Sequence, residues 1–519
     1  MNPFSRKPSA QPPPPEDQPC DDILGDLPRG EEGRRRHDSH LPRTYFEPPE
    51  KLAALGFKDK SADNFLGIVN GVTERIIRDD GRAEYRTRGG VPVGVRDDRS
   101  MTTQAGSRAG KGRSVIIPDL LTCGGSMIVV DVKGENANAT ARFRAQVLGQ
   151  KVFVIDPFRI CAEVCVPYLA RFNPLRAISE DSVTIVEDAG SIADACIVPS
   201  GGDAHWDETA KAWAEAVSLH VVTSDLFKPE EKTLVTVGDL IAGRRLEWNQ
   251  LLIDMLANDA LDNFIAGAAR AMKEKPDREL GSVLSNVRKN LKFLQYDSIR
   301  DVLSGHDFNL EDLKRGAITI YLVLPATRMA TCSQLIRLFI NQTLAAFERV
   351  RTKPKIPAML VIDEFPVLGR MQELENAIGQ IAGLGLRIHT IVQDLGQIKA
   401  LYKDRWESFM GNSGVLRFFG VADEFSANWI SNYLGKTTIN VTDVGSTTAE
   451  QKNTQGASGF QERQQVQELL TPAEIRRYFA RDDHYNRQLV LIPGRRPYVL
   501  QRANYDQHEF FAGRFDTLT

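Results

Sequence analysis

Residues 105–114 read AGSRAGKGRS and lead directly into Val115 to Leu121, an apolar stretch expected to be helical. Glycines let consecutive backbone N–H groups converge on a phosphate, the N-terminus of a helix adds positive potential, and a lysine supplies a point charge. The pattern predicts a phosphate-binding P-loop. Its phosphate-binding residues are expected to be Gly106, Ser107, Arg108, Ala109, Gly110, Lys111, Gly112 and Arg113.

This loop departs from the usual P-loop pattern. Ala105 stands where the first glycine is expected, and Gly112 stands where a Ser or Thr hydroxyl normally binds Mg²⁺. Ser114 comes two positions later and would face another direction along the helix. The preceding strand, residues 101–103, is polar for a buried position. Taken alone, the loop is therefore also compatible with a flexible glycine turn.

A second motif, MLVIDE at residues 359–364, is typical of a buried strand that ends in two carboxylates. Ligands bind at the carboxyl ends of strands in open α/β sheets, so Asp363 is expected to hold Mg²⁺ through water and Glu364 to orient and deprotonate an attacking water. Acidic residues also end strands simply because solvent begins there. A catalytic role for the two carboxylates is favoured because they occur in the same chain as the loop around Lys111.

Three further residues are candidates for a catalytic role. Gln393 follows the expected strand Ile388 to Val392, where it would hydrogen-bond a γ-phosphate or the attacking water, although an ordinary polar strand end is the alternative. Arg370 and Arg417 are candidates for an arginine finger that reaches the nucleotide of a neighbouring subunit. Surface ion pairing is the alternative for each arginine.

Short apolar runs separated by helical stretches predict an α/β fold, a doubly wound and mostly parallel sheet with buried strands. No internal repeat is evident. The expected strands are Met127 to Asp131, Val152 to Asp156, Ile318 to Leu324, Met359 to Asp363, Ile388 to Val392, Val415 to Phe419, Gln488 to Ile492 and Tyr498 to Gln501.

The strand signal fades between Asp156 and Ile318, where helical spacing takes over. Residues 176–310 contain 14 Lys and Arg against 23 Asp and Glu. An acidic helical module inserted in a sheet protein would repel nucleic acid and suits contacts with proteins better.

The two remaining segments look irregular. Residues 1–50 hold 11 of the 26 prolines and show no apolar periodicity, which predicts a disordered arm that is either a solvated tail or a docking segment. Residues 437–465 are rich in polar residues and glycine, which predicts a mobile connection before a helix that starts at 471–474.

Composition places the 519-residue chain among ordinary globular proteins. Its net charge of −3 gives no general attraction to nucleic acid, so any such contact must be local. No apolar stretch reaches the length of a membrane-spanning helix, and no secretory leader is evident, so we expect a cytosolic location. The six cysteines follow neither a disulfide framework nor a zinc pattern.

Several blocks, in this order and spacing, resemble the coupling-protein family of type IV secretion and conjugation. They are GKG followed by SVIIPDLL, VVDVKGEN at 129–136, VIDPF at 154–158, FNPL at 172–175 and LVIDEFPVLGRM at 360–371. The resemblance runs from about Gly106 to near Pro493.

The resemblance implies a RecA-like motor that forms a homo-hexamer and hydrolyses ATP with Mg²⁺. Such motors dock a relaxase–DNA complex or protein effectors onto a type IV secretion channel, and an inserted helical domain helps to choose the substrate. The family's phosphate lysine falls on Lys111, its acidic pair on Asp363 and Glu364, and its sensor-like glutamine on Gln393. The implied domains are 51–160 with 311–519 for the nucleotide-binding unit and 161–310 for the inserted helical domain.

The N-terminus departs from the family, whose members commonly carry transmembrane helices there. We therefore expect a cytoplasmic protein, peripheral at the inner face of the bacterial inner membrane, whose arm recruits a separate membrane subunit. Two other functions remain open: a non-hydrolysing scaffold that recruits substrates, and a translocase of duplex DNA that acts without a secretion channel. The blocks VVDVKGEN and FNPL favour the coupling proteins over the translocases.

Overall fold

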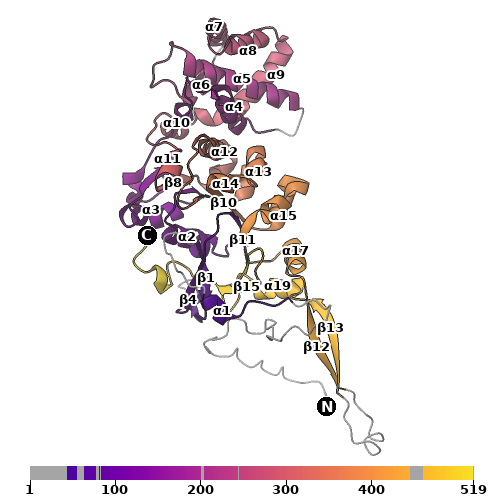
Figure 1. The fold of residues 1–519 in the computed structure, drawn as a ribbon. Coiled ribbons are helices and arrows are strands. Elements are labelled where there is room, and N and C mark those ends of the chain that lie inside the picture. Colours follow the sequence, from indigo (N-terminus) through magenta and orange to yellow (C-terminus); the bar gives the residue numbers. More distant parts are fainter. Residues whose placement is uncertain are drawn as a thin grey trace, which may run out of the picture.

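The computed structural model describes residues 44–54, 64–77, 81, 83–199, 204–243, 245–444 and 460–517. A large sheet flanked by helices forms one part of the molecule, and a group of helices stands at one end of it (Figure 1). The predicted α/β class is confirmed. The expected disordered arm lies outside the described residues up to residue 43.

The sheet has eleven strands, and its central strands are parallel. At one end, antiparallel strands extend it from β11. In spatial order the strands are β4 (Val91–Val95), β1 (Asn64–Val69), β15 (Tyr498–Gln501), β14 (Arg487–Leu491), β11 (Ser413–Phe419), β5 (Ser100–Ala105), β10 (Leu386–Val392), β9 (Ala358–Ile362), β6 (Met127–Asp131), β8 (Ile318–Val323) and β7 (Lys151–Ile155).

Strand β5, which leads into the loop, is fully buried although its sequence is polar. The Thr102 hydroxyl lies 2.9 Å from the hydroxyls of both Thr390 in β10 and Ser413 in β11, and the Thr103 hydroxyl lies 2.8 Å from Nε2 of His389. A buried polar group costs little free energy when it is hydrogen-bonded. Partners on both neighbouring strands therefore make a polar strand stable at the centre of the sheet.

Helices outside the inserted module pack on the sheet or connect its strands. The loop residues continue into a π-helical turn at Gly112–Ile116 and then into α2. The α-helices outside the inserted module are α1 (Pro49–Ala53), α2 (Ile117–Thr122), α3 (Glu135–Gln146), α11 (Asp312–Arg315), α12 (Ala326–Arg349), α13 (Gln372–Ala377), α14 (Ile381–Leu384), α15 (Leu395–Tyr402), α16 (Glu407–Gly411), α17 (Glu424–Leu434) and α19 (Pro472–Tyr478).

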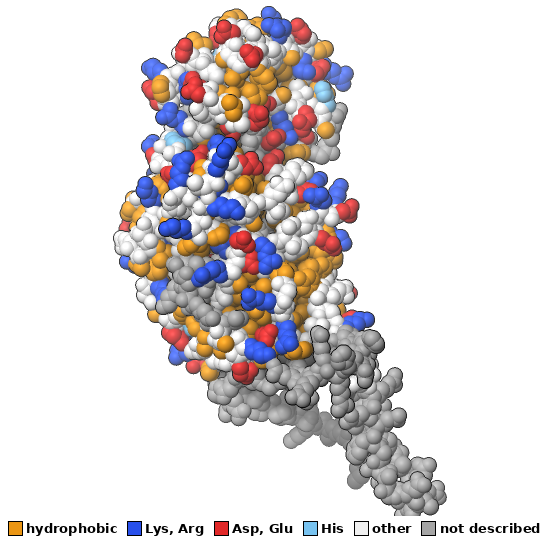
Figure 2. Space-filling view, in the orientation of Figure 1, with side chains coloured by type: hydrophobic (Ala, Val, Ile, Leu, Met, Phe, Trp, Pro, Cys, Tyr) orange, Lys and Arg blue, Asp and Glu red, His pale blue; other side chains and the backbone are white. Residues whose placement is uncertain are grey.

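Between β7 and α11 the described residues form helices and connecting turns, and the α-helices of this segment gather at the end of the molecule away from α19 (Figure 1). They are α4 (Ile185–Cys196), α5 (Ala204–Thr223), α6 (Leu234–Ala242), α7 (Arg245–Leu256), α8 (Phe264–Lys273), α9 (Asp277–Asn290) and α10 (Asp297–Leu303). One continuous apolar core joins α4 to α12 and to the sheet. Figure 2 shows both signs of charge spread over one face of this module, so its excess of acids is not gathered there into one patch.

Two expectations about irregular segments are wrong where the structure describes them. Phe46 is buried, and the backbone N–H of Glu47 donates to the carbonyl of Pro497, so the last residues of the predicted arm pack on the sheet domain. The predicted mobile connection contributes β12 (Lys436–Val444) and β13 (Phe460–Glu468), which pair as an antiparallel hairpin. A second hairpin outside the large sheet consists of β2 (Val72–Ile77) and β3 (Ala83–Arg88).

Within the described residues, no helix combines the length and the apolar character needed to cross a membrane.

Candidate functional site

Four predicted site residues meet at the carboxyl ends of the neighbouring parallel strands β5, β10 and β9. Nζ of Lys111 lies 2.8 Å from Oδ1 of Asp363 and forms a second ion pair with Glu364. Nε2 of Gln393 donates to Oε2 of Glu364 at 3.1 Å. Strand β10 lies between the loop strand and the acidic strand, which places Gln393 between the other two motifs.

The loop requires glycine at its first turn. A Cβ on Gly106 would lie 2.1 Å from the carbonyl oxygen of Gly420, which follows β11, and no side chain can be accommodated at that distance. Gly110 has φ of +88°, a conformation that residues with a Cβ rarely adopt. A glycine at position 105 is therefore not needed, because the close contact between the loop backbone and Gly420 occurs at Gly106.

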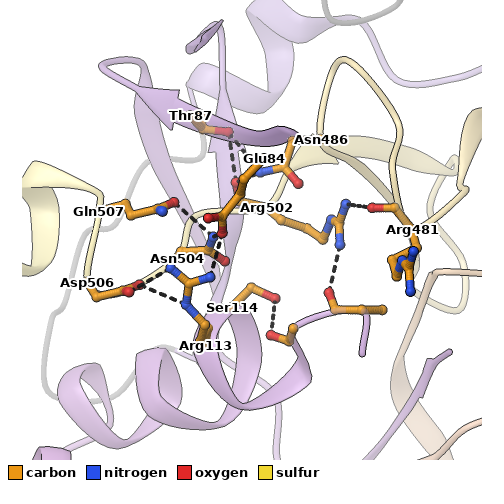
Figure 3. A network of polar contacts seen from close by, with 12 residues as sticks. Glu84, Thr87, Arg113, Ser114, Arg481, Asn486, Arg502, Asn504, Asp506 and Gln507 are labelled. Carbon is orange, nitrogen blue, oxygen red and sulfur yellow. Dashed lines mark hydrogen bonds and ion pairs between the residues drawn. The ribbon is translucent and has the colours of Figure 1, made fainter. Parts of the chain in front are cut away.

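The other predicted loop residues are placed differently from one another. Ser107 and Arg108 are exposed, whereas Ala109 is buried. Arg113 turns away from the loop and pairs with Glu84 and with Asp506, the latter at 2.6 Å (Figure 3). Ser107 and Arg108 thus remain accessible to a ligand, and Arg113 is held by two carboxylates.

Burial and the neighbouring charges shift the pKa of Lys111 in opposite directions. Burial by itself lowers the pKa of the Lys111 ammonium, but the carboxylates of Asp363 and Glu364 outweigh it, and the pKa lies above its ordinary value. Burial also raises the pKa of Asp363, and Lys111 offsets only part of that shift. The lysine therefore carries its charge at neutral pH.

Glu364 has a strained backbone. Its φ of 57° and ψ of 44° lie in the left-handed region, which residues other than glycine, asparagine and aspartate rarely adopt. Such strain persists only where the surrounding structure enforces it, and it is concentrated at functional sites. The conformation directs the Glu364 carboxylate toward Lys111 and Gln393 rather than along the strand.

Asp131 is a buried carboxylate whose pKa is affected by Asp363 of the site, and no role was predicted for it from the sequence. Asp131 is the last residue of β6, and Asp363 directly follows β9. This shared position at the end of an apolar strand was the sequence signal that could have drawn attention to Asp131. Its carboxylate accepts the backbone N–H of Ala137 at 2.9 Å and of Lys133 at 3.2 Å. Burial raises the pKa of Asp131 to about 6, and the nearby charge of Asp363 acts in the same direction.

Asp131 makes folding stability depend on pH. Its pKa is about 6 in the fold against 3.8 when unperturbed, so the folded protein binds more protons between these values and loses stability as the pH rises. The difference corresponds to about 3 kcal/mol. Asn does not titrate, so the free energy of unfolding of Asp131→Asn, relative to that of the parent, is expected to rise by about 3 kcal/mol from pH 4 to pH 7. Urea unfolding at several pH values measures this difference. Parallel stability curves for the two proteins would contradict the assignment.

The residues present fit a magnesium ion. Asp363 offers a buried carboxylate beside Lys111, and carboxylate and amide oxygens are hard ligands that suit Mg²⁺. Ser114 does not replace the missing loop hydroxyl, because its hydroxyl donates to the carbonyl of Gly110 at 3.0 Å. A Cβ on Gly112 would instead lie 4.0 Å from Oδ1 of Asn136, so an amide oxygen stands near the usual position of that hydroxyl.

The structure corrects the placement of Arg417. Its side chain is 0% exposed inside the sheet, where Nη2 donates to the carbonyl of Phe65 and lies 3.7 Å from Oδ1 of Asp119. A side chain in this position does not reach a neighbouring subunit, so the prediction of Arg417 as an arginine finger is wrong. Arg370 is 48% exposed and pairs with Glu375 at 3.0 Å.

Curated proteins of conjugation are similar to this chain in sequence. It is 28% identical over 396 residues to the conjugal transfer protein TraG of Escherichia coli, and the aligned region covers 72% of the chain and 61% of that protein. It is 27% identical over 412 residues to the protein VirD4 of Agrobacterium fabrum, and the aligned region covers 77% of the chain and 58% of that protein. The chain thus spans about three fifths of the length of these relatives.

Solved structures share the fold. The bacterial conjugative coupling protein TrwB, in an unbound form lacking N-terminal residues, superposes with a TM-score of 0.60 at 15% identity over 90% of this chain and 96% of that one. TrwB in complex with ADP and Mg²⁺ gives a TM-score of 0.56 at 16% identity over 92% and 98%. The profile of the family described as "Type IV secretory system Conjugative DNA transfer" matches residues 69–518. The chain therefore belongs to the family of type IV secretion proteins for conjugative DNA transfer, as the sequence blocks indicated.

Proposed function

We propose that the chain is a coupling protein that hydrolyses ATP and recruits a relaxase–DNA complex, protein effectors or both to a type IV secretion channel. The observation that carries the proposal is the contact of Lys111 with Asp363 and Glu364, which brings a phosphate-binding cation and two carboxylates to one end of the sheet. Membership of the conjugative DNA transfer family supports the choice of system.

Each residue has a distinct role in the proposed hydrolysis. Lys111 and the N–H groups of the loop hold the phosphates. Asp363 and Asn136 hold Mg²⁺, which would neutralise charge on the phosphates when bound. Glu364 accepts a proton from the attacking water, and Gln393, already hydrogen-bonded to Glu364, orients that water.

In the structure, Lys111 is fully engaged by the two carboxylates. A bound polyphosphate competes with them for the ammonium group, because oxygen anions of either kind accept its hydrogen bonds. We expect Glu364 to be released from Lys111 on binding, since its neighbour Gln393 can hold it in place. The carboxylate then becomes free to accept a proton.

The proposed partners follow from the family and from the module. Residues 161–310 form the substrate-recognition domain in this proposal, and their excess of acids suits proteins such as a relaxase or an effector better than naked DNA. A homo-hexamer would let an exposed arginine such as Arg370 act on a neighbouring subunit's nucleotide. We place the protein at the cytoplasmic face of the inner membrane, where its N-terminal arm recruits a membrane subunit.

The proposal is tested by steady-state ATP hydrolysis of the purified chain at low salt, with single-stranded DNA, duplex DNA or no DNA. We expect hydrolysis above the Lys111→Ala background and stimulation by DNA. Light scattering establishes whether a ring is present in each sample. Hydrolysis no higher than this background in samples that contain the ring would overturn the motor and favour the scaffold. Stimulation by duplex DNA alone would favour the translocase.

A further inference from the structure

An aromatic ladder, defined by Phe425, Trp429, Tyr433 and Trp406, lies along α17. Phe425, Trp429 and Tyr433 follow one another at intervals of four residues, so they share one face of the helix. The rings of Trp429 and Tyr433 are stacked, with centroids 5.1 Å apart at an interplanar angle of 30°. The centroid of Trp406 lies 5.7 Å from that of Phe425 and 6.1 Å from that of Trp429. The four rings therefore form one continuous aromatic surface.

Part of this ladder is accessible. Phe425 and Trp429 pack against the apolar core and are half-buried, whereas Tyr433 is 48% exposed. Apolar residues scattered singly over a surface are ordinary, but a contiguous group of them marks an interaction site. Aromatic rings contribute strongly to such sites, because each ring buries a large apolar area when a ligand covers it. The ladder thus has the character of a docking surface.

The described chain begins beside the last ring of the ladder. The backbone N–H of Thr44 donates to the carbonyl of Lys436 at 3.4 Å, and a Cβ on Gly435 would lie 3.9 Å from Oγ1 of Thr44. Gly435 directly follows α17 and is two residues from Tyr433, at the base of the β12–β13 hairpin (Figure 1). Residues 1–43 therefore join the described chain at the Tyr433 end of the ladder.

This preceding segment contains a sequence that suits an aromatic surface. Residues 11–17 read QPPPPED. Consecutive prolines favour the polyproline II helix, which docks on aromatic side chains because it loses little conformational entropy on binding. Every second residue of that helix lies about 6 Å further along its axis. The ring centroids of the ladder are 5.1 to 6.1 Å apart, so the proline rings can match its spacing.

Charge favours the same segment. Nζ of Lys399 on α15 lies 4.7 Å from the centroid of the Phe425 ring, and among the described residues it forms no ion pair. Glu16 and Asp17 directly follow the four prolines. A carboxylate beside an exposed ammonium group gains a modest favourable energy. Lys399 can therefore accept the acidic end of the segment when the prolines cover the ladder.

The connection to Thr44 is long enough for this contact. Residues 18–43 separate Asp17 from Thr44. A coil of that length spans roughly 30 Å, whereas an eleven-residue helix such as α17 is only about 17 Å long. The segment therefore reaches every ring of the ladder. Because it belongs to the same chain, its effective concentration at the ladder is up to about millimolar, which allows even a weak contact to form.

We propose that the aromatic ladder binds the proline run at residues 12–15 of the same chain, with Glu16 and Asp17 directed toward Lys399. The contact holds the N-terminal arm on the sheet domain at α17. A partner that binds the arm, such as a membrane subunit, must first displace the prolines from the ladder. The ladder is thus an internal docking site that controls access to the arm.

The test measures how a fluorescent peptide of residues 9–19 binds to the full chain, by anisotropy. The serine variant Pro12→Ser/Pro13→Ser/Pro14→Ser/Pro15→Ser cannot cover its own ladder. It should bind the peptide at least about five-fold more tightly than the parent, in which the tethered segment competes. Adding Tyr433→Ala to the serine variant should weaken binding at least about five-fold, as the loss of one aromatic contact does. Phe264→Ala removes a ring that is 39% exposed on α8 and is the matched control.

A charge exchange tests the orientation of the segment. In the serine variant, Lys399→Glu should weaken binding of the peptide, and a peptide carrying Glu16→Lys and Asp17→Lys should recover it. Lys273→Glu, which changes an exposed lysine on α8, should affect neither peptide. Because Lys399 and Tyr433 are both exposed, neither substitution removes a buried core contact.

Equal affinity of the peptide for the parent and the serine variant would overturn the proposal, as would unchanged affinity after Tyr433→Ala. If the difference between parent and serine variant depends on protein concentration, the segment comes from a second copy and the contact within one chain is wrong. If Tyr433→Ala weakens binding of an oligothymidine but not of the peptide, the ladder binds nucleic acid instead. Recovery by the exchanged charges would confirm the contact with Lys399.

Discussion

Glu364→Gln is expected to bind ATP at least as tightly as the parent and to hydrolyse it at least about 100-fold more slowly, the usual contribution of a general base. The amide has the size of the carboxylate but cannot accept the proton of the attacking water. It also withdraws one of the two carboxylates that compete with phosphate for Lys111, while Asp363 keeps its 2.8 Å contact. Single-turnover hydrolysis and calorimetric binding measure the two effects separately.

Glu407→Gln is the matched control for this substitution. Glu407 is exposed at the start of α16 and carries the same change of charge. It should leave hydrolysis unchanged. If Glu364→Gln hydrolyses ATP within a few-fold of the parent, Glu364 is not the base. If it also loses ATP binding, the carboxylate supports the loop rather than the chemical step.

Arg417→Met is expected to lower the free energy of unfolding by about 3–5 kcal/mol, because it removes the guanidinium that is paired with the buried carboxylate of Asp119. Arg417 is 0% exposed, and Asp119 lies 3.7 Å from it on α2, the helix that continues from the loop. Burial raises the pKa of Asp119 to about 6, whereas the charges of Arg417 and Arg387 favour its ionised form. Urea unfolding at pH 7.5 measures the loss.

Two comparisons make this expectation specific to the buried charge. The double variant Asp119→Leu/Arg417→Met replaces the pair by apolar side chains of similar size and should recover most of the loss. Arg351→Met, which changes an exposed arginine just after α12, should change stability by less than about 0.5 kcal/mol. Similar stability of Arg417→Met and the parent would show that the pair is not maintained in solution.

The burial of Arg417 illustrates what a pattern of residue types leaves undetermined. An arginine within an apolar strand was compatible with a finger on the surface, because its long side chain can reach either solvent or a buried partner. The partner Asp119 belongs to a helix almost 300 positions earlier in the chain. Only the packing of α2 against β11 decides between the two.

Strand β5 presents the same difficulty. Its sequence, SMTTQA, has too few apolar residues to predict burial, yet all six residues are buried. The hydroxyls are satisfied by Thr390, Ser413 and His389 on the two neighbouring strands. A strand's own sequence does not report the partners that compensate its polar groups. The hairpin of β12 and β13 was missed for a related reason, because its stability depends on pairing rather than on an apolar pattern.

The sequence by itself determined the α/β class, the central apolar strands and four residues of the site. Apolar runs of strand length specify burial locally, and parallel strands place their carboxyl ends at one edge, which is why Lys111, Asp363, Glu364 and Gln393 could be expected to meet. The tertiary structure alone decided the burial of Arg417, the hydrogen-bond partners of the polar strand β5 and the pairing of β12 with β13. These features arise from contacts between segments far apart in the chain, and no local periodicity encodes such contacts.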